Sequence, residues 1–301
     1  MPSEEFEQAL TFLPRDTAVP GDTFEDVRVK FAPLHGHPPG NDVVCQPGSY
    51  GGVDGTWVRP KGGGSDRCAL VFFHGGAFVS CPAESYTFYA ARLTRALAVP
   101  SFIIDYRRAP EHRFPTAVDD GADAVAGMYA AGWTPDRLAF AGDSCGGGLA
   151  VSTLLRLRER GAPMPAGAAC LGGWFDLEAS GDAALHPVGQ ELFVEPSWIR
   201  DRGRDYVGPD GDPRHPLASP IHADLSGLPP LFLQAGQYDR CRDDSTRLAT
   251  RAARDGVAVT LEVWPEMPHG FQGLYDLCPE ARQAIAQAAR FIDRCLDRPA
   301  G

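Results

Sequence analysis

The amino-acid sequence predicts an α/β fold in which helices flank a mostly parallel central sheet. Two observations lead to this prediction. From about residue 68 onward, short runs of β-branched and aromatic residues alternate with stretches of helical periodicity. In addition, a glycine-rich turn at residues 142–146 joins one such run to a helix. Strands that alternate with helices form parallel sheets covered on both faces, and 301 residues suffice for one such domain.

Six runs from residue 68 onward are expected to form buried strands. They are short, apolar and bounded by turn residues, as the strands of a covered parallel sheet are. Two further strands, at 24–31 and 55–59, are expected to open the sheet in antiparallel pairing. The six buried runs are 68–73, 101–105, 137–141, 166–171, 230–235 and 257–264.

Four helices are expected between and after these strands, at 84–98, 116–131, 144–160 and 280–296. The third ends where Gly161 interrupts the helical pattern. The last presents apolar residues on one face, which predicts that it packs against the sheet. These residues are Ala281, Ile285, Ala288, Ile292 and Leu296.

Two segments do not fit the alternation, residues 1–42 and residues 181–222. The first begins with a short amphipathic helix pattern that includes Phe6 and Leu10, and continues with a proline- and glycine-rich stretch. The second carries apolar residues such as Trp198 among charged ones. These features are typical both of a lid over a functional site and of ordinary surface loops. No internal repeat divides the chain, so we expect a single domain over its whole length.

Composition and charge exclude several classes of partner. The formal net charge is −11, and an acidic surface repels nucleic-acid backbones and anionic membranes. No apolar run approaches the ~20 residues of a membrane span. Residues 1–13 contain three glutamates where a secretory signal has basic residues, so we expect a cytoplasmic protein. The eight cysteines form no C-x-x-C pair, and most are expected to be reduced and buried.

Residues 142–146 read Gly-Asp-Ser-Cys-Gly and match the G-x-S-x-G pattern of a nucleophile elbow. The pattern follows an expected strand and opens an expected helix, which is the context that the elbow needs. Small residues flank the serine because the turn is sharp. Ser144 is therefore the candidate nucleophile. Cys145 is the rival as a thiol nucleophile, but it lies one position past the tip, where its side chain is expected to pack beneath the helix.

Residues 74–78 read His-Gly-Gly-Ala-Phe and follow the strand expected at 68–73. This is the H-G-G-x type of loop that precedes the first helix of serine hydrolases and supplies backbone donors to an oxyanion. Glycine lets the backbone N–H groups of Gly75 and Gly76 approach closely, and Cys145 would add a third N–H. His74 is expected to anchor the loop by hydrogen bonds instead of acting as a base.

A serine nucleophile needs a base and a carboxylate behind the base. In hydrolases with this elbow, the order along the chain is nucleophile, acid, histidine. His269 follows the last expected strand and is the candidate base for Ser144. Asp239 follows the preceding strand and is the candidate acid, which would hold the correct histidine tautomer. Asp243 and Asp244 are the alternatives, although carboxylates are favoured in a first helical turn for dipole reasons alone.

Four motifs in this order resemble those of the bacterial hormone-sensitive-lipase-like esterases, also called lipolytic family IV or α/β-hydrolase fold-3. The resemblance extends from about residue 51 to the C-terminus. Residues 51–60 and 262–271 are most similar to the branch of ε-lactone hydrolases and short-chain carboxylesterases. The four motifs are HGGAF at 74–78, DYRRAPEHRFPTAVDD at 105–120, GDSCGG at 142–147 and MPHGF at 267–271.

The resemblance implies an α/β-hydrolase fold with a helical cap formed by residues 1–42 and 181–222. It implies a triad of Ser144, Asp239 and His269, with short-chain esters or lactones as substrates. No metal or organic cofactor is expected, and homodimers are common in this family. The family usually has alanine where Cys145 stands, which is expected to narrow the acyl pocket slightly. Phe78 and Trp174 are candidates for substrate binding in the pocket, with core packing as the alternative for Trp174.

Three functions remain open from the sequence alone. The first is hydrolysis of an ester or lactone through an acyl-enzyme on Ser144. The second is an acyltransferase or a lyase or cyclase of specialised metabolism that uses the same triad. The third is a non-catalytic ligand-binding protein on the same fold, but such proteins lose the histidine that is present here as His269.

Overall fold

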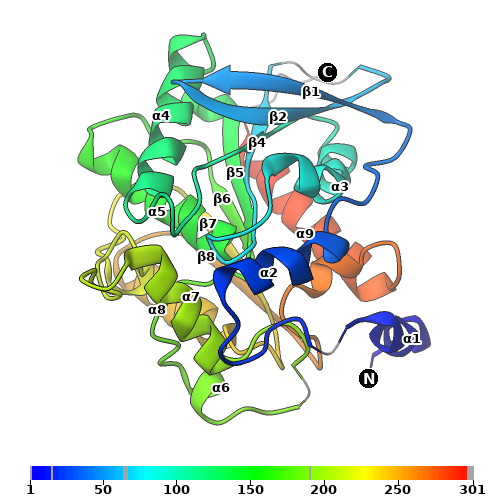
Figure 1. Ribbon diagram of the computed structural model, residues 1–301. Helices are drawn as coiled ribbons and strands as arrows, with labels where there is room; N and C mark the ends of the chain where they lie inside the picture. Colours follow the sequence, from blue (N-terminus) through cyan, green and yellow to red (C-terminus); the bar gives the residue numbers. More distant parts are fainter. Residues whose placement is uncertain (1, 15, 64–66, 190, 297–301) are drawn as a thin grey trace.

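The computed structural model describes residues 2–14, 16–63, 67–189 and 191–296. Its centre is an eight-stranded sheet with the strand order β1-β2-β4-β3-β5-β6-β7-β8 (Figure 1). β3 to β8 run parallel, and β1 and β2 add an antiparallel pair at one edge. The α/β prediction is therefore confirmed. The strands are β1 (Val43–Tyr50), β2 (Val53–Pro60), β3 (Ala69–Phe73), β4 (Ser101–Ile104), β5 (Leu138–Asp143), β6 (Ala168–Leu171), β7 (Leu231–Gly236) and β8 (Val259–Trp264).

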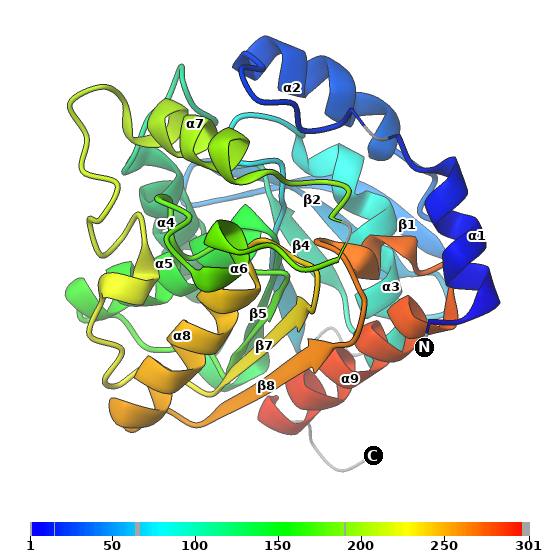
Figure 2. The same ribbon diagram turned by 90° about the horizontal axis from the view of Figure 1, so that it is seen from below.

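Helices cover both faces of this sheet, as Figure 2 shows. On one side lie α3 (Thr87–Leu97) and α9 (Pro279–Cys295), which bury side chains such as Phe291 and Ile292 against the strands. On the other side lie α4 (Thr116–Ala130), α5 (Cys145–Glu159) and α8 (Arg242–Arg254). Both faces of β3 and β5 are fully buried, which explains why these strands read as continuous apolar runs.

The segment Phe24–Phe31 is the α-helix α2, so the expectation of a strand at 24–31 is wrong. The alternation of apolar and polar residues around Val27 and Val29 indicated a strand. A capping box at the start of the segment favours a helix instead, because the Thr23 side chain accepts the Asp26 N–H and the Asp26 carboxylate accepts the Thr23 N–H. In the helix only Val27 is buried, and Val29 is 73% exposed.

The strand that the sequence did not indicate is β1, which contains Pro47 and Gly48. Both residue types disfavour strands, but β1 lies at the edge of the sheet, where a missing N–H is tolerated. Its partner β2 includes the expected strand at 55–59, and the pairing is antiparallel as expected.

Four helices gather at the end of the sheet where the parallel strands finish (bottom of Figure 1). They are α1 (Glu4–Phe12), α2 (Phe24–Phe31), α6 (Asp182–Leu185) and α7 (Pro196–Val207). All four belong to the two segments that break the strand–helix alternation. α2 and α7 meet through the stacked rings of Phe31 and Trp198, whose centroids lie 5.8 Å apart. That these helices act as a cap stays a prediction.

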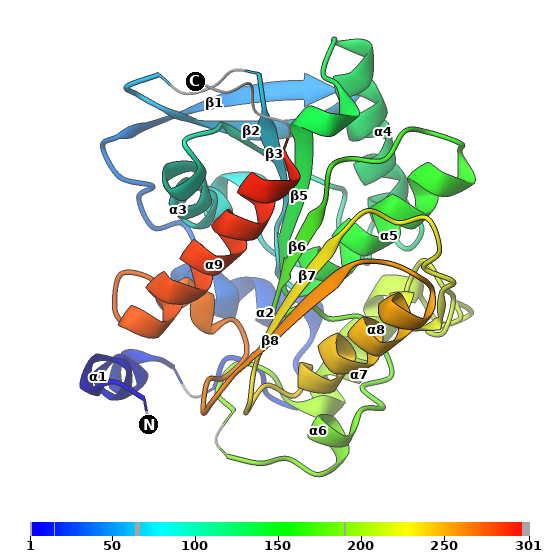
Figure 3. The same cartoon turned by 180° about the vertical axis from the view of Figure 1, so that it is seen from behind.

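α1 is attached to the opposite end of the chain. The Ser3 backbone N–H and hydroxyl both donate to the Glu280 carboxylate at the start of α9, and Figure 3 shows the two helices near each other. Phe6 packs beneath α1 against Met267 and Phe271. All eight cysteines are free. Among the described residues, no helix is both long and apolar enough to cross a bilayer.

Candidate active site

Three polar side chains that lie far apart in the sequence meet at the carboxyl end of the sheet. Ser144 follows β5, Asp239 follows β7 and His269 follows β8. The His269 Nε2 atom lies 2.8 Å from the Ser144 hydroxyl oxygen, and its Nδ1 lies 3.0 Å from the Asp239 Oδ1. Parallel strands that end at one edge bring these loops together. The three residues predicted from the sequence thus form one continuous hydrogen-bonded chain.

The turn that carries Ser144 is strained and sterically tight. Ser144 has φ +55° and ψ −124°, a backbone conformation that L-residues rarely adopt. A Cβ atom at Gly142 would lie 2.2 Å from the Gly146 carbonyl oxygen, and one at Gly146 would lie 2.1 Å from the Phe73 carbonyl oxygen. The glycines of G-x-S-x-G are therefore required by close backbone approach. The strain places the serine at the tip between β5 and α5.

The imidazole of His269 is almost fully buried, and its surroundings favour the protonated form. Burial alone would lower the pKa of His269, but the charge and hydrogen bond of Asp239 raise it above its usual value. Asp239 is completely buried and also accepts the Cys241 N–H at 2.7 Å. This second bond orients the carboxylate toward Nδ1. The arrangement suits a base that becomes a cation during the reaction.

The alternative acids Asp243 and Asp244 are held elsewhere. Asp244 accepts the backbone N–H groups of Phe175 and Asp176. Asp243 accepts the Ala183 N–H at 2.6 Å and pairs with its neighbour in the chain, an arginine. Both carboxylates therefore hold backbone N–H groups of residues 175, 176 and 183 next to α8, and neither bonds to the imidazole.

The thiol of Cys145 points away from the substrate side. Its sulfur accepts the Phe78 N–H at 3.2 Å and lies 3.8 Å from the Tyr106 hydroxyl. The residue is fully buried, and burial raises the pKa of the thiol to about 12. A thiol that stays protonated is a poor nucleophile. This geometry therefore gives no support to Cys145 as the nucleophile.

Backbone N–H groups without a hydrogen-bond partner in the described part of the chain occur in the loop after β3 and directly after Ser144. Within the described residues, the N–H groups of Gly75, Gly76, Ala77 and Cys145 make no hydrogen bond. Gly76 and Ala77 line the cavity next to Ser144, and Gly75 and Cys145 are not among its lining residues. Ala77, which has φ +56°, was not singled out from the sequence. Which of these N–H groups bind an oxyanion stays a prediction.

His74 anchors this loop and does not face the serine. Its Nδ1 lies 2.8 Å from the Gly75 carbonyl oxygen, and its ring stacks on Tyr106 with centroids 4.1 Å apart. The side chain is fully buried, and burial lowers the pKa of His74 to about 4. The ring is therefore neutral at neutral pH and serves the fold.

Ser144 and His269 open into a cavity of about 450 Å³. Its wall is mostly apolar, and aromatic rings contribute much of it. Helices α1, α2 and α7 supply part of this wall, together with the stretch before α7. The large apolar lining residues are Phe12, Leu13, Phe31, Leu34, Phe88, Trp174, Phe193, Val194, Trp198, Ile199, Leu274 and Leu277.

The two residues predicted to bind substrate occupy different places. Trp174 lines the cavity, is almost fully buried and donates its indole N–H to the Asp176 carbonyl oxygen at 2.8 Å, so its contact with substrate stays a prediction. Phe78 is not among the lining residues. Its ring stacks on Tyr206 with centroids 3.8 Å apart, and its N–H bonds the Cys145 sulfur. Phe78 therefore packs beneath the loop.

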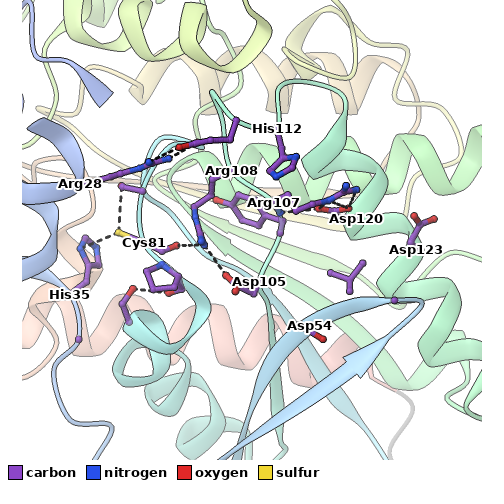
Figure 4. Close-up of a pocket in the computed structure, with 18 of the residues that line it drawn as sticks. Arg28, His35, Asp54, Cys81, Asp105, Arg107, Arg108, His112, Asp120 and Asp123 are labelled. Carbon is purple, nitrogen blue, oxygen red and sulfur yellow. Dashed lines mark hydrogen bonds and ion pairs between the residues drawn. The ribbon is translucent and has the colours of Figure 1, made fainter. Parts of the chain in front are cut away.

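A larger cavity of about 1120 Å³ is lined in part by Ser80 and Cys81. Figure 4 shows its charged walls. The three arginines of these walls pair with carboxylates, Asp54 and Asp123 add further negative charge, and the cavity contains neither Ser144 nor His269, so we do not place the active site there. The pairs are Arg28–Glu111, Arg107–Asp120 and Arg108–Asp105.

Among the described residues, two groups of side chains have the spacing of metal ligands, and hydrogen bonds within the protein already hold part of each group. One consists of Asp239, Cys241 and His269, where both ring nitrogens of the histidine have hydrogen-bond partners. The other contains Asp176 with Glu178 and His222. Its buried carboxylate accepts four donors, which are Arg247, the Glu178 N–H, and the N–H and hydroxyl of Ser180.

Glu191 is a second residue that the sequence did not indicate. It lies between α6 and α7, and its carboxylate accepts the backbone N–H of His269 at 2.8 Å. No motif marks it, because the contact joins an irregular stretch to a loop 78 residues away.

Known proteins resemble this chain over most of its length. A family model described as alpha/beta hydrolase fold matches residues 70–273. An acetyl-hydrolase from Streptomyces hygroscopicus is 38% identical over 257 residues, which cover 85% of this chain and 83% of the relative. An esterase from Acinetobacter venetianus is 29% identical over 250 residues, covering 83% and 82%. The crystal structure of an esterase from the bacterial hormone-sensitive lipase family superposes with a TM-score of 0.93 at 34% identity, over 98% of this chain and 99% of that one.

Proposed function

Because this chain belongs to the alpha/beta hydrolase fold family, as a carboxylic ester hydrolase of the bacterial hormone-sensitive-lipase-like group, we propose that Ser144, His269 and Asp239 form its catalytic triad. We further propose that its substrates are short-chain esters or lactones. The observation that carries the proposal is the hydrogen-bonded chain of 2.8 Å and 3.0 Å from serine through imidazole to carboxylate, beside an apolar cavity.

In the acylation half-reaction, the Ser144 oxygen attacks the ester carbonyl carbon, and its proton passes to Nε2 of His269. The carbonyl oxygen becomes an oxyanion, for which we propose the N–H groups of Gly75, Gly76 and Cys145 as donors. The tetrahedral intermediate collapses when the alcohol leaves and takes the proton from the imidazolium. The product is an acyl-enzyme on the serine.

In the second half-reaction a water molecule repeats these steps. His269 removes a proton from the water, the hydroxide attacks the acyl carbon, and the proton returns to the Ser144 oxygen as the acid leaves. Asp239 keeps Nδ1 protonated throughout and stabilises the imidazolium without taking the proton. No bond in this cycle requires a metal or an organic cofactor.

The cavity supports small, neutral substrates. Its volume of about 450 Å³ lies at the small end of the usual ligand-pocket range of roughly 300–1,000 Å³. None of the lining residues is an arginine or lysine in the part of the chain that the structure describes. An apolar wall without a cation favours uncharged acyl and alcohol groups over anionic ones.

The proposal is tested by replacing the candidate nucleophile. Ser144→Ala should lower the rate of p-nitrophenyl butyrate hydrolysis by about 10⁴-fold or more, because the attacking oxygen is lost. A fluorophosphonate should label the unsubstituted protein at Ser144 and leave the variant unlabelled. Ser152→Ala is a control at a second serine, since Ser152 is buried in α5 and is not among the residues that line the cavity. Label on the Ser144→Ala protein, or its full activity, would contradict the assignment.

The substrate class requires a separate measurement. p-Nitrophenyl esters of increasing acyl length and lactones of increasing ring size should give the highest kcat/KM for the small members. A maximum with long-chain esters would overturn the short-chain proposal. Product analysis with an added alcohol distinguishes hydrolysis from transfer, because acyl transfer would yield a new ester instead of the free acid.

A further inference from the structure

One carboxylate outside the candidate triad reaches the backbone of the candidate base. Glu191 lies in the irregular stretch between α6 and α7, within residues 181–222. Its Oε2 atom accepts the His269 N–H at 2.8 Å. This hydrogen bond joins the inserted segment to the loop between β8 and α9 that carries the imidazole.

The other oxygen of the same carboxylate organises the cavity wall. Oε1 of Glu191 accepts the N–H groups of Leu192 and Phe193, each at 2.8 Å. Phe193 in turn lines the apolar cavity together with Val194. One carboxylate therefore connects the wall that contacts substrate to the loop that holds His269.

The surroundings of Glu191 oppose its charge, and its N–H donors favour it. Burial, with the nearby charge of Asp239, raises the pKa of Glu191 to about 7, while the N–H groups of Phe193 and His269 act in the opposite direction. A partly buried carboxylate with a raised pKa depends on such hydrogen bonds to stay charged. The titratable and charged groups around it are Asp239, Cys241 and His269 on the inside, and Glu195, Arg200 and Arg240 around a surface cavity that Glu191 also lines.

We propose that Glu191 is a positioning residue for His269, which holds the base loop in the place where the imidazole meets Ser144. This inference rests on the proposed function, because it assumes that His269 is the base. Glu191 touches no reacting atom. It fixes the backbone from which the imidazole extends, and its charge adds to that of Asp239 in stabilising the imidazolium.

The test combines two variants of Glu191. Glu191→Gln keeps the shape of the side chain but replaces one acceptor oxygen with an NH₂ group, which can only donate. The remaining oxygen cannot accept all three N–H groups that the carboxylate accepts. We expect kcat for p-nitrophenyl butyrate to fall about tenfold with KM within about threefold, and the acidic limb of the kcat/KM profile to move to lower pH. Glu191→Asp keeps the charge but is one methylene shorter. We expect its kcat to fall similarly while its acidic limb stays in place.

Glu195→Gln is the matched control. Glu195 lies in the same stretch and accepts the N–H and hydroxyl of Ser197 at the start of α7, without contact to the base loop. We expect its kcat and acidic limb to match those of the unsubstituted protein. Circular dichroism and a thermal unfolding curve for each variant separate loss of fold from loss of positioning.

The results for these variants either support the positioning role of Glu191 or contradict it. A folded Glu191→Gln protein with unchanged kcat and an unchanged acidic limb would overturn the inference, and so would an equal shift in Glu195→Gln. If Glu191→Gln fails to fold, a Glu191→Asp protein with full kcat overturns the inference on its own. Failure of the proposed function looks different, since the unsubstituted protein would then not be labelled at Ser144.

Discussion

At the residue scale, the contacts of Asp239 distinguish it from its acidic neighbours. Asp239 faces the Nδ1 atom of His269 at 3.0 Å, while Asp243 accepts a backbone N–H of the inserted segment. The sequence favoured Asp239 because it directly follows a strand. The contacts add a physical reason, since a carboxylate can set the tautomer only of a ring it touches.

Asp239→Asn should lower kcat by about 10⁴-fold, because an amide in place of the carboxylate favours the wrong imidazole tautomer and cannot stabilise the cation. Steady-state hydrolysis of p-nitrophenyl butyrate measures the effect. Asp243→Asn is the control and should stay within a few-fold of the unsubstituted protein. Full activity in Asp239→Asn would move the acid to another carboxylate.

The pH dependence of the reaction follows from the environment of His269. Burial by itself lowers the pKa of this histidine, but Asp239 raises it above the ordinary value of 6.5. A base acts only when it is neutral, so activity rises as pH rises through this pKa. We therefore expect the acidic limb of kcat/KM for the free enzyme to lie above pH 6.5. A limb well below that value would contradict the assigned hydrogen bond.

At the element scale, α2 shows how a cap can outweigh a period-two pattern. Val27, Val29 and Phe31 alternate with charged residues, which is typical of a half-buried strand. Thr23 and Asp26 form a capping box that satisfies free N–H groups at the start of a helix. The spacing T-x-x-D was readable in the sequence, and it was the better guide.

Thr23→Ala should lower the free energy of unfolding by about 1 kcal/mol, the usual cost of losing an N-cap side chain. Chemical denaturation followed by tryptophan fluorescence measures the change. Thr11→Ala is the control, because Thr11 is exposed in α1 and donates only to the carbonyl oxygen of Gln8. Equal loss in both variants would show that the cap of α2 carries no special stability.

At the scale of the whole molecule, two segments distant in sequence close one cavity. Phe31 on α2 and Trp198 on α7 stack at 5.8 Å, and both line the cavity beside Ser144. The Arg202 guanidinium also lies over the Trp198 ring, 5.6 Å from its centroid. The size of the cavity therefore depends on how the N-terminal segment meets the insertion.

Trp198→Ala should shift preference toward longer acyl chains, because removing the indole enlarges the cavity. Its cost in stability should be about 3–5 kcal/mol, as for other large buried aromatic residues. The ratio of kcat/KM for long and short p-nitrophenyl esters reports the shift. Trp133→Ala is the control, since Trp133 stacks on Trp57 and is not among the lining residues of the cavity. An equal shift in that variant would exclude a local effect.

The sequence by itself determined the fold class, the six parallel strands and four of the helices from residue 68 onward, and the candidates Ser144, Asp239 and His269. These follow from local signals, because periodicity, turn glycines and position after a strand are all encoded within a few neighbouring residues. The α/β pattern then places the ends of parallel strands at one edge, so residues that follow these strands are expected to meet.

Only the tertiary structure decided which residues line the cavity and that Glu191 reaches the base loop. Ala77 rather than Gly75 lines the cavity, and Phe78 turns to Tyr206 beneath the loop. The Glu191 bond to His269 spans 78 residues and joins two irregular segments. No local pattern encodes such a contact, because it depends on how the inserted segment packs against a finished sheet.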